Sequence, residues 1–343
     1  MSRSSGRVTL KDLAAQTGYT VNTVSRALKN KPDIAPQTCR AIQQVARRMG
    51  YVPNRMASAL RQGRSGTLAL IVGNLVNPFF GAMVTEVENA ARAQDLSVLV
   101  LSSRDNERDE RRAVTTAVER QADGVLLCPS QRSREPLRML EEARMPFVLM
   151  ARDFPDEACD SVGCDEAAAG FLAARHLIEA GHRRIAVLYD YEFVHGILSR
   201  VQGCCQAVRE AGLPDCLPLV ARDAASAADG LTRLMRRGVT GCVAYCDLAA
   251  LSTLSELERR GVRMPDDLAM VGFDNLQASL NLATPLCSVA VDVRAQAQAA
   301  VGLLLGRVRG EEGPAQKQLF PTRVVCRGSC ALHRGAITTG AWE

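Results

Sequence analysis

Five side chains between residues 19 and 30 are suited to contacting the edges of DNA bases: Val21, Asn22, Thr23, Ser25 and Arg26. Arginine can donate two hydrogen bonds to guanine, asparagine can pair with adenine, and valine can pack on a thymine methyl group. Val24 and Leu28 are four residues apart and define the buried side of a helix, so the base-reading side chains face away from it. The pattern indicates a helix that enters the major groove.

The helix that carries Val21 to Arg26 must be positioned by a helix that precedes it in the sequence. Thr9 is a candidate N-cap for LKDLAAQTG, and Gly18 is a candidate left-handed C-cap that ends it. The second helix follows almost at once, which predicts a helix-turn-helix. A third helical segment within residues 36–51 offers apolar residues that would close an all-α three-helix core: Ile42, Val45, Ala46 and Met49. Any small helical bundle is the alternative interpretation.

The charge of the chain is concentrated at its N-terminus. Residues 1–66 contain 12 Lys and Arg against only Asp12 and Asp33, whereas the remainder contains 30 basic and 35 acidic residues. A basic segment on a mildly acidic body attracts the phosphate backbone of DNA. A solvated basic face or a disordered tail would show the same charge, but neither would also show the helical pattern.

Motifs for enzymatic chemistry are missing from the sequence. There is no GxxxxGK[ST] loop, no GxGxxG after a strand and no HExxH, and the four histidines are dispersed. We therefore expect a protein that is not an enzyme, with no catalytic residues and no cofactor. The twelve cysteines are scattered without a CxxC pair, so we expect reduced thiols in the core rather than disulfides or metal ligands.

The body of the chain, from residue 67 onward, alternates apolar runs with amphipathic helical segments, as parallel α/β sheets do. Seven candidate strands are TLALIVGNL, LSVLVLSS, DGVLLCPS, FVLMAR, RRIAVLYD, CVAYCD and LAMVGFDN. This number exceeds what one six-stranded sheet usually holds, which predicts two similar lobes. No segment looks like a signal peptide or reaches about 18 uninterrupted apolar residues, so we expect a cytoplasmic protein without membrane contact.

Motifs along nearly the whole chain resemble the LacI/GalR family of bacterial transcription regulators: VTLKDLAAQTG, TVSRAL, GYVPNRMASALRQGRSG, NPFF, HLIEAGHRRIAVL and MPDDLAMVGFDN, in the family's order. The resemblance implies a DNA-binding headpiece at 1–52, a hinge helix and linker at 53–66, and a two-lobed, periplasmic-binding-protein-like (type I) α/β core at 67–336. Crossings near 164, 292 and 322 would give one lobe of 67–163 plus 293–321 and another of 164–292 plus 322–336. NRMASALRQGRSGTLALIV and RVQGCCQAVREAGLP look similar to the maltose-regulon branch.

By this resemblance Val21, Asn22 and Arg26 read base edges, and Leu60 is a hinge-helix residue that wedges into the minor groove. An apolar wedge of this kind unstacks a base step and bends the duplex. The predicted DNA contacts are Thr9, Val21, Asn22, Thr23, Ser25, Arg26, Tyr51, Asn54, Ala57 and Leu60.

Candidate ligand contacts follow the strands, because open α/β sheets bind small molecules at the carboxyl ends of their strands. They are Asn77, Phe79, Arg200 and Asp274. Arg200 and Asp274 match family positions that hold a sugar or another polar effector. An inter-lobe salt bridge is the alternative for Arg200, and a turn or helix cap is the alternative for Asp274. For Asp247 we expect a helix cap.

Three residues depart from the family's usual sugar pocket. Ala151 stands where an aspartate is common, Ala224 stands near a usual aromatic residue, and Cys246 replaces a frequent asparagine. The loss of polar and aromatic partners would leave a free sugar under-satisfied, so these departures weaken the transfer of the sugar pocket. They allow an effector that is smaller or differently charged, or no effector.

The sequence as a whole predicts a homodimeric transcriptional regulator, most simply a repressor, that binds a palindromic operator and responds to a small effector such as a sugar or sugar phosphate. The alternative is a transport-type sugar-binding protein without a regulatory role. That protein would share the two-lobed core, but it would need an export signal in place of the basic N-terminal segment.

Overall fold

The structure is a computed structural model that describes residues 8–52, 64–190, 193–277 and 283–330. The chain divides after Ser65 into two compact units. Of the hinge helix and linker expected at 53–66, residues 53–63 lie outside the described residues. No helix in the described ranges combines the length and the hydropathy that a membrane span requires.

The described residues of the N-terminal unit form three helices, α1 (Leu10–Thr17), α2 (Val21–Leu28) and α3 (Pro36–Met49). Thr9 caps α1 as expected, because its hydroxyl accepts the amide of Asp12 at 3.3 Å, and Gly18 ends α1 with a φ of 74°. Leu13, Val24 and Ile42, one from each helix, are fully buried in the shared core. The predicted three-helix arrangement is confirmed.

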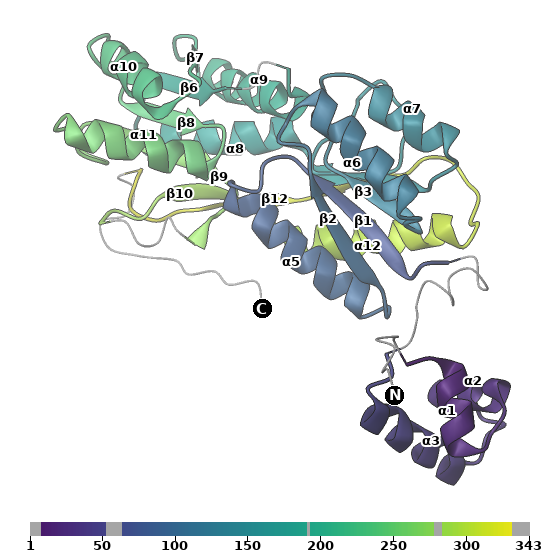
Figure 1. Cartoon of the computed structure of the whole chain (residues 1–343). Coiled ribbons are helices and arrows are strands. Elements are labelled where there is room, and N and C mark those ends of the chain that lie inside the picture. Colours follow the sequence, from purple (N-terminus) through teal and green to yellow (C-terminus); the bar gives the residue numbers. More distant parts are fainter. Residues whose placement is uncertain (1–7, 53–63, 191–192, 278–282, 331–343) are drawn as a thin grey trace. The chain divides into compact units, whose positions relative to one another are not determined.

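The C-terminal unit begins with a parallel six-stranded sheet in the order β11-β5-β4-β3-β1-β2. The strands are β1 (Thr67–Val72), β2 (Ser97–Ser102), β3 (Gly124–Leu127), β4 (Phe147–Met150), β5 (Ser161–Cys164) and β11 (Lys317–Phe320). Helices α5 (Pro78–Arg92) and α12 (Val293–Val308) cover one face, and α6 (Glu107–Glu119) and α7 (Glu135–Glu142) cover the other (Figure 1). We call this sheet with its helices the first lobe.

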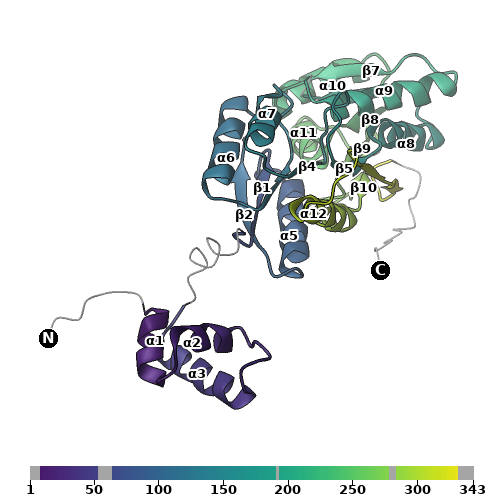
Figure 2. The ribbon, with the colours of Figure 1, turned by 90° about the vertical axis from the view of Figure 1, so that its right-hand side faces the viewer.

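A second six-stranded sheet repeats the arrangement in the order β12-β10-β9-β8-β6-β7. The strands are β6 (Ile185–Tyr189), β7 (Leu217–Val220), β8 (Gly241–Ala244), β9 (Ala269–Phe273), β10 (Cys287–Val291) and β12 (Thr322–Val325). Helices α8 (Glu166–Glu179) and α9 (His195–Glu210) cover one face, and α10 (Ala224–Met235) and α11 (Asp247–Arg259) cover the other (Figure 2). This is the second lobe.

The two sheets confirm the predicted pair of lobes and all seven predicted strands. Five strands were missed by the sequence analysis: β5, β7, β10, β11 and β12. Of these, β7, β11 and β12 are four-residue strands at sheet edges, where the hydrophobic pattern is weakest. One of them also departs from the expected parallel arrangement, because β12 pairs with β10 antiparallel.

The chain passes between the lobes three times: after β5, between β10 and α12, and between β11 and β12. Each lobe is therefore built from separate stretches of sequence. The carboxyl ends of β1 and β9, in different lobes, lead into segments that line the same cavity.

Two glycines bring α8 and α9 of the second lobe into close contact. A Cβ atom on Gly170 would overlap the carbonyl oxygen of Arg200, and a Cβ atom on Gly203 would overlap the carbonyl oxygen of Ala167. Only a residue without a side chain permits helix backbones to approach this closely. The contact places Arg200 of α9 beside Glu166, the first residue of α8.

We expect Gly203→Ala to lower the free energy of unfolding by about 1–3 kcal/mol, because the added methyl group overpacks the contact between α8 and α9. Urea denaturation followed by circular dichroism measures the change. Gly81→Ala is the matched control, because Gly81 is also helical but a Cβ there meets nothing within 4 Å. Equal effects of the two substitutions would contradict the role assigned to the close contact.

The expectation that all cysteines remain thiols is wrong for one pair. Cys205 in α9 and Cys216, after the end of that helix, form a disulfide with their Cα atoms 5.4 Å apart. The chain doubles back after Glu210, which brings the two residues within the range that a disulfide spans. Most of the other cysteines are buried, as expected of small core residues.

Candidate functional site

The N-terminal unit presents the polar face of α2 to solvent. Val21 is 40% exposed, Asn22 and Arg26 are exposed, and Thr23 and Ser25 are half-buried. Their neighbour Val24 is fully buried, so the predicted division of α2 into a buried and an exposed side is confirmed. The side chains thus lie on an accessible surface, where contact with DNA remains a prediction.

The other predicted DNA contacts fall into two groups. Thr9 is exposed at the start of α1, and Tyr51 is half-buried against the core of the three helices. Asn54, Ala57 and Leu60 lie outside the described residues.

Arg26 is held by an acidic partner in the N-terminal unit. Its Nε donates to Asp33 Oδ2 at 2.8 Å, and its Nη2 lies 2.6 Å from Asp33 Oδ1. This hydrogen bonding holds the pKa of Asp33 below its ordinary value. The two parallel contacts use the same fork of donors that a guanine edge would accept, so binding a base requires Arg26 to leave Asp33.

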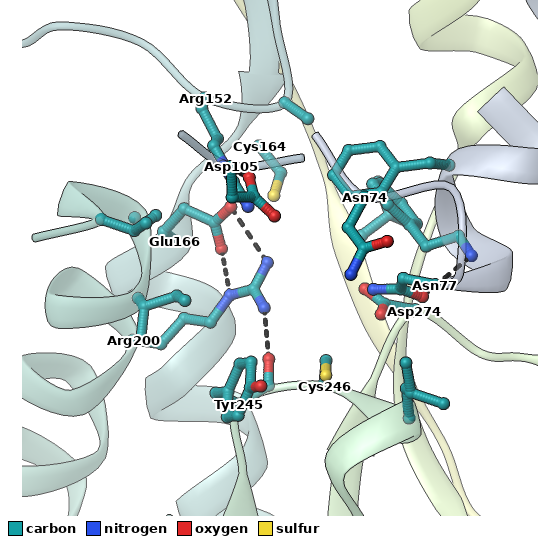
Figure 3. Close-up of a pocket in the computed structure, with 18 of the residues that line it drawn as sticks. Asn74, Asn77, Asp105, Arg152, Cys164, Glu166, Arg200, Tyr245, Cys246 and Asp274 are labelled. Atoms are coloured by element: carbon teal, nitrogen blue, oxygen red, sulfur yellow. Dashed lines mark hydrogen bonds and ion pairs between the residues drawn. The ribbon is translucent and has the colours of Figure 1, made fainter. Parts of the chain in front are cut away.

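A cavity of about 900 Å³, including the part open to solvent, lies between the two lobes (Figure 3). All four predicted effector contacts, Asn77, Phe79, Arg200 and Asp274, are among the residues that line it. The first lobe adds Asn74, Asp105, Arg152 and Gln296, and the second lobe adds Glu166 and Tyr245. The structure therefore brings the predicted residues together at the carboxyl ends of both sheets.

Arg200 forms an ion pair within the second lobe. Its Nε and Nη2 donate to the two carboxylate oxygens of Glu166 at 2.5 and 3.1 Å, and its Nη1 donates to the carbonyl of Tyr245 at 2.6 Å. Its guanidinium also lies 4.4 Å from the centre of the Phe273 ring. The alternative of an inter-lobe salt bridge is wrong, because Glu166 belongs to the same lobe.

The first lobe contributes a comparable pair. Arg152 Nη1 lies 2.6 Å from Asp105 Oδ1 and donates to the carbonyl of Pro129 at 3.3 Å. Asp105 is buried against Gly73, the residue after β1, where a Cβ would come within 2.5 Å of its carboxylate. Both arginines of the cavity thus have carboxylate partners, which leaves little unneutralised positive charge there.

Within the part of the chain that the structure describes, two buried polar atoms at the cavity have no hydrogen-bond partner: Asp274 Oδ2 and Gln296 Nε2. Asp274 follows β9 with a φ of 96°, in the left-handed region. Burial raises the pKa of its carboxyl well above the ordinary value, although the positive charge of Arg200 and, less strongly, a hydrogen bond from Asn77 oppose this shift. Buried polar groups are normally paired. An unpaired acceptor and an unpaired donor at one cavity therefore indicate a ligand that donates a hydrogen bond to Asp274 and accepts one from Gln296.

Aromatic rings line the cavity despite the departures noted in the sequence. Phe79 and Phe80 meet edge to face with ring centres 5.5 Å apart, and Tyr245 lies on the opposite lobe. Ala151 and Cys246 also line the cavity, whereas Ala224 begins α10 and is not among the described lining residues.

The expectation that Asp247 caps a helix is wrong. Cys246 is the N-cap of α11, and its sulfur accepts the amide of Ala249 at 3.4 Å. The buried carboxylate of Asp247 instead accepts the amide of Leu276 and the hydroxyl of Ser288, both at 2.8 Å. Asp247 thus holds the segment after β9 that carries Asp274.

Burial raises the pKa of Asp247 to about 7. Between its unfolded value of about 4 and this folded value, the native state binds more protons than the unfolded state. The contribution of Asp247 to stability is therefore complete at acid pH and is lost as the pH rises through about 7. We expect the free energy of unfolding of the wild type, relative to Asp247→Asn, to be higher at pH 5 than at pH 8 by more than about 1 kcal/mol. Urea denaturation at the two pH values tests this, and a pH-independent difference would contradict it.

Comparison with known proteins identifies the family. The profile of the lacI family of bacterial regulatory proteins matches residues 9–54, and the profile of the periplasmic binding protein-like domain matches residues 174–330. The HTH-type transcriptional regulator CelR of Thermobifida fusca is 30% identical over 335 residues, which cover 94% of this chain and 98% of CelR. The chain belongs to the LacI family of bacterial regulatory proteins.

Other relatives match most of the chain. The transcriptional repressor CytR of Escherichia coli (strain K12) is 28% identical over 94% of this chain and 96% of CytR. A solved complex of a transcriptional regulator CelR with cellobiose is 28% identical, with a TM-score of 0.71, and the match covers 94% of this chain and all of that one. These LacI-family relatives are transcriptional regulators rather than enzymes, and the resemblance found in the sequence is confirmed.

Sequence reasoning missed five polar residues of this LacI-family cavity: Asp105, Arg152, Glu166, Tyr245 and Gln296. The first two follow β2 and β4, so the rule that placed Asp274 would also have found them. Glu166 follows β5, a strand that the sequence analysis did not recognise. Gln296 lies in the first turn of α12, on the side facing the cavity, and no local signal in the sequence distinguishes it.

Proposed function

We propose that this LacI-family regulator binds a palindromic operator as a homodimer, represses transcription there, and is controlled by a neutral carbohydrate bound between its lobes. This function requires the chromosome, which places the protein in the cytoplasm. The headpiece would span 1–52, the hinge and linker 53–66 and the effector-binding core 67–336, with the lobe boundaries given by the three crossings of the chain.

The DNA-binding part of the proposal is supported by charge and geometry. The N-terminal 66 residues carry a strong positive excess, and α2 exposes Asn22 and Arg26 on one face. One such headpiece covers only a few base pairs, so a two-fold dimer that reads a palindrome supplies the length that specificity needs. The repressor direction is supported by likeness to CytR, which is a repressor.

The open hydrogen-bonding atoms of Asp274 and Gln296 are the observation that carries the effector proposal. A sugar hydroxyl can donate to the carboxylate oxygen and another can accept from the amide nitrogen, so a polyhydroxylated ligand satisfies both. Phe79 and Phe80 offer apolar surface for the faces of a sugar ring. The related CelR structure contains cellobiose.

A neutral sugar suits the cavity better than a sugar phosphate. Arg152 and Arg200 are already paired with Asp105 and Glu166, so a phosphate would have to displace a carboxylate or remain without a partner in a half-buried site. Asp274 would add further repulsion when ionised.

Calorimetric titration of the full chain with cellobiose, glucose, ribose and glucose 6-phosphate tests the effector. We expect at least one neutral sugar to bind and to change operator affinity. Tighter binding of glucose 6-phosphate than of every neutral sugar would overturn the assignment of a neutral ligand. Genome-wide mapping of bound sites tests the DNA-binding part, which requires shared palindromic sequences beneath the bound regions.

Removal of residues 1–66 separates this proposal from a transport-type binding protein. We expect the truncated chain to keep sugar binding and to lose operator binding. Unchanged binding of full-length and truncated chains to a mapped site would contradict the role of the headpiece.

A further inference from the structure

Four side chains from separate parts of the second lobe converge on one point: His176 of α8, Cys287 at the start of β10, and Cys326 and Cys330 in the loop after β12. Their sulfur and imidazole nitrogen atoms all lie within 4.8 Å of one another. His176 Nε2 lies 3.1 Å from Cys330 Sγ, and Cys326 Sγ lies 3.5 Å from Cys330 Sγ. Three cysteines that are widely separated in the sequence therefore lie together in the fold.

The loop that carries two of these thiols is held in place by Ser329. Its hydroxyl accepts the amide of Cys287 at 2.7 Å and donates to the carbonyl of Met270 at 2.5 Å, while its own carbonyl accepts the amide of Met270 at 2.9 Å. Strands β9 and β10 thus fix the loop from both sides. Cys330 is fully buried and Cys326 is half-buried, so the cluster is positioned by the fold and is not a chance contact between mobile side chains.

We propose that His176, Cys287, Cys326 and Cys330 bind a thiolate-preferring divalent cation, zinc foremost, as a tetrahedral Cys₃His site. Zinc binds sulfur at about 2.3 Å and imidazole nitrogen at about 2.0–2.1 Å, which puts neighbouring ligand atoms about 3.5–3.8 Å apart. The observed spacings bracket this range, so shifts of about 1 Å or less complete the site. The two loop cysteines are separated by three residues, a spacing typical of structural zinc sites.

The surroundings of the cluster can balance the charge of the loaded site. Binding releases the three thiol protons to solvent and leaves neutral His176 to donate its Nε2 lone pair, so three thiolates and Zn²⁺ carry one net negative charge. The guanidinium of buried Arg327 lies close enough to interact with Cys287, and the Arg327 amide donates to Cys287 Sγ at 3.1 Å. Outer hydrogen bonds of this kind orient metal ligands.

Buried thiols outside the cluster make different contacts from those inside it. Cys204 donates to the carbonyl of Gly170 at 3.1 Å, and Cys128 lies against the sulfur of Met83 at 3.4 Å. In the cluster three sulfurs face one another and an imidazole. Packing alone gives no reason for that arrangement, because apolar residues of similar volume would fill the same space without polar atoms.

The proposed site also connects to the effector cavity. Arg327, between the two loop cysteines, donates to the carbonyl of Leu286 at 2.6 Å and to the side-chain oxygen of Asn275. Asn275 follows Asp274, which lines the cavity. Metal binding would therefore fix the segment that presents Asp274 to an effector.

Metal content of the full-length protein tests the proposal. After reduction, reconstitution with Zn²⁺ and gel filtration, we expect about one zinc per wild-type chain by mass spectrometry of the metal. Titration with Co²⁺ should give the visible absorption of tetrahedral thiolate coordination. Cys326→Ser should weaken Co²⁺ binding by more than the roughly 10- to 100-fold typical of outer-shell changes, whereas His176→Cys should retain binding as a Cys₄ site.

Cys159→Ser is the matched control, because Cys159 is a half-buried free thiol outside the cluster. Its metal content should equal that of the wild type. A wild type that holds no more metal than Cys326→Ser would overturn the proposal, provided that circular dichroism shows both chains folded. A disulfide between Cys326 and Cys330 that persists after reduction and excludes Co²⁺ would overturn it as well.

Discussion

Asp274→Ala is expected to abolish the response of operator binding to a carbohydrate while leaving operator binding without carbohydrate unchanged. One carboxylate oxygen of Asp274 is buried at the cavity and accepts no hydrogen bond from the described residues. An effector alters DNA affinity only by binding one conformation of the protein better than the other, a coupling that is typically about 5- to 150-fold. Loss of this contact should bring the ratio of operator affinities with and without the sugar close to one.

Operator affinity measured by fluorescence anisotropy, with and without the sugar identified by titration, provides the test. Gln296→Leu should also remove the response, and it should not lower the melting temperature because it replaces an unpaired buried amide with an apolar side chain of similar size. Asp229→Ala is the control, since Asp229 is exposed and pairs with Arg260 outside the cavity. If both cavity variants keep the wild-type response, the effector site lies elsewhere.

Local pattern was sufficient to predict the helices of the N-terminal unit and the strand that precedes Asp274. The four-residue spacing of Val24 and Leu28 placed the core side of α2, and capping residues at Thr9 and Gly18 placed the ends of α1, because both signals act within a few residues along the chain. The same is true of the seven recognised strands. Asp274 was found because its strand was found.

Contacts between residues that are far apart in the sequence could not be predicted from local patterns. The Arg200–Glu166 pair depends on the close approach of α8 and α9 at Gly170 and Gly203, which no local propensity encodes. His176 and Cys330 are 154 residues apart in sequence yet 3.1 Å apart in space. The sequence analysis searched only for CxxC pairs and so passed over Cys326 and Cys330, which are separated by three residues, and no local pattern links them to His176 and Cys287.

Arg26→Ala is expected to weaken binding to the cognate operator by about one to two orders of magnitude and to change binding to random DNA little. The reason is that a bidentate contact to a base is lost only where the correct base is present. Arg40→Ala is the matched control. Arg40 is an exposed cation on α3 and is not among the predicted DNA contacts. Its removal should therefore weaken binding to the cognate operator and to random DNA by the same factor. Equal losses on cognate and random DNA for Arg26→Ala would assign Arg26 to a phosphate.

A substitution of Asp33, the ion-pair partner of Arg26, also tests whether Arg26 contacts a base. Arg26 must leave Asp33 before it can contact a base. Asp33→Asn removes one negative charge, which raises affinity for any DNA, and it also frees Arg26, which raises affinity only for the cognate operator. The gain in affinity should therefore be larger on the operator than on random DNA. Anisotropy titrations of both DNAs at two salt concentrations separate the two effects, since a general charge effect weakens with salt on both DNAs equally. In the Arg26→Ala background the extra gain on the operator should disappear. If Asp33→Asn retains that gain without Arg26, the ion pair does not compete with base reading.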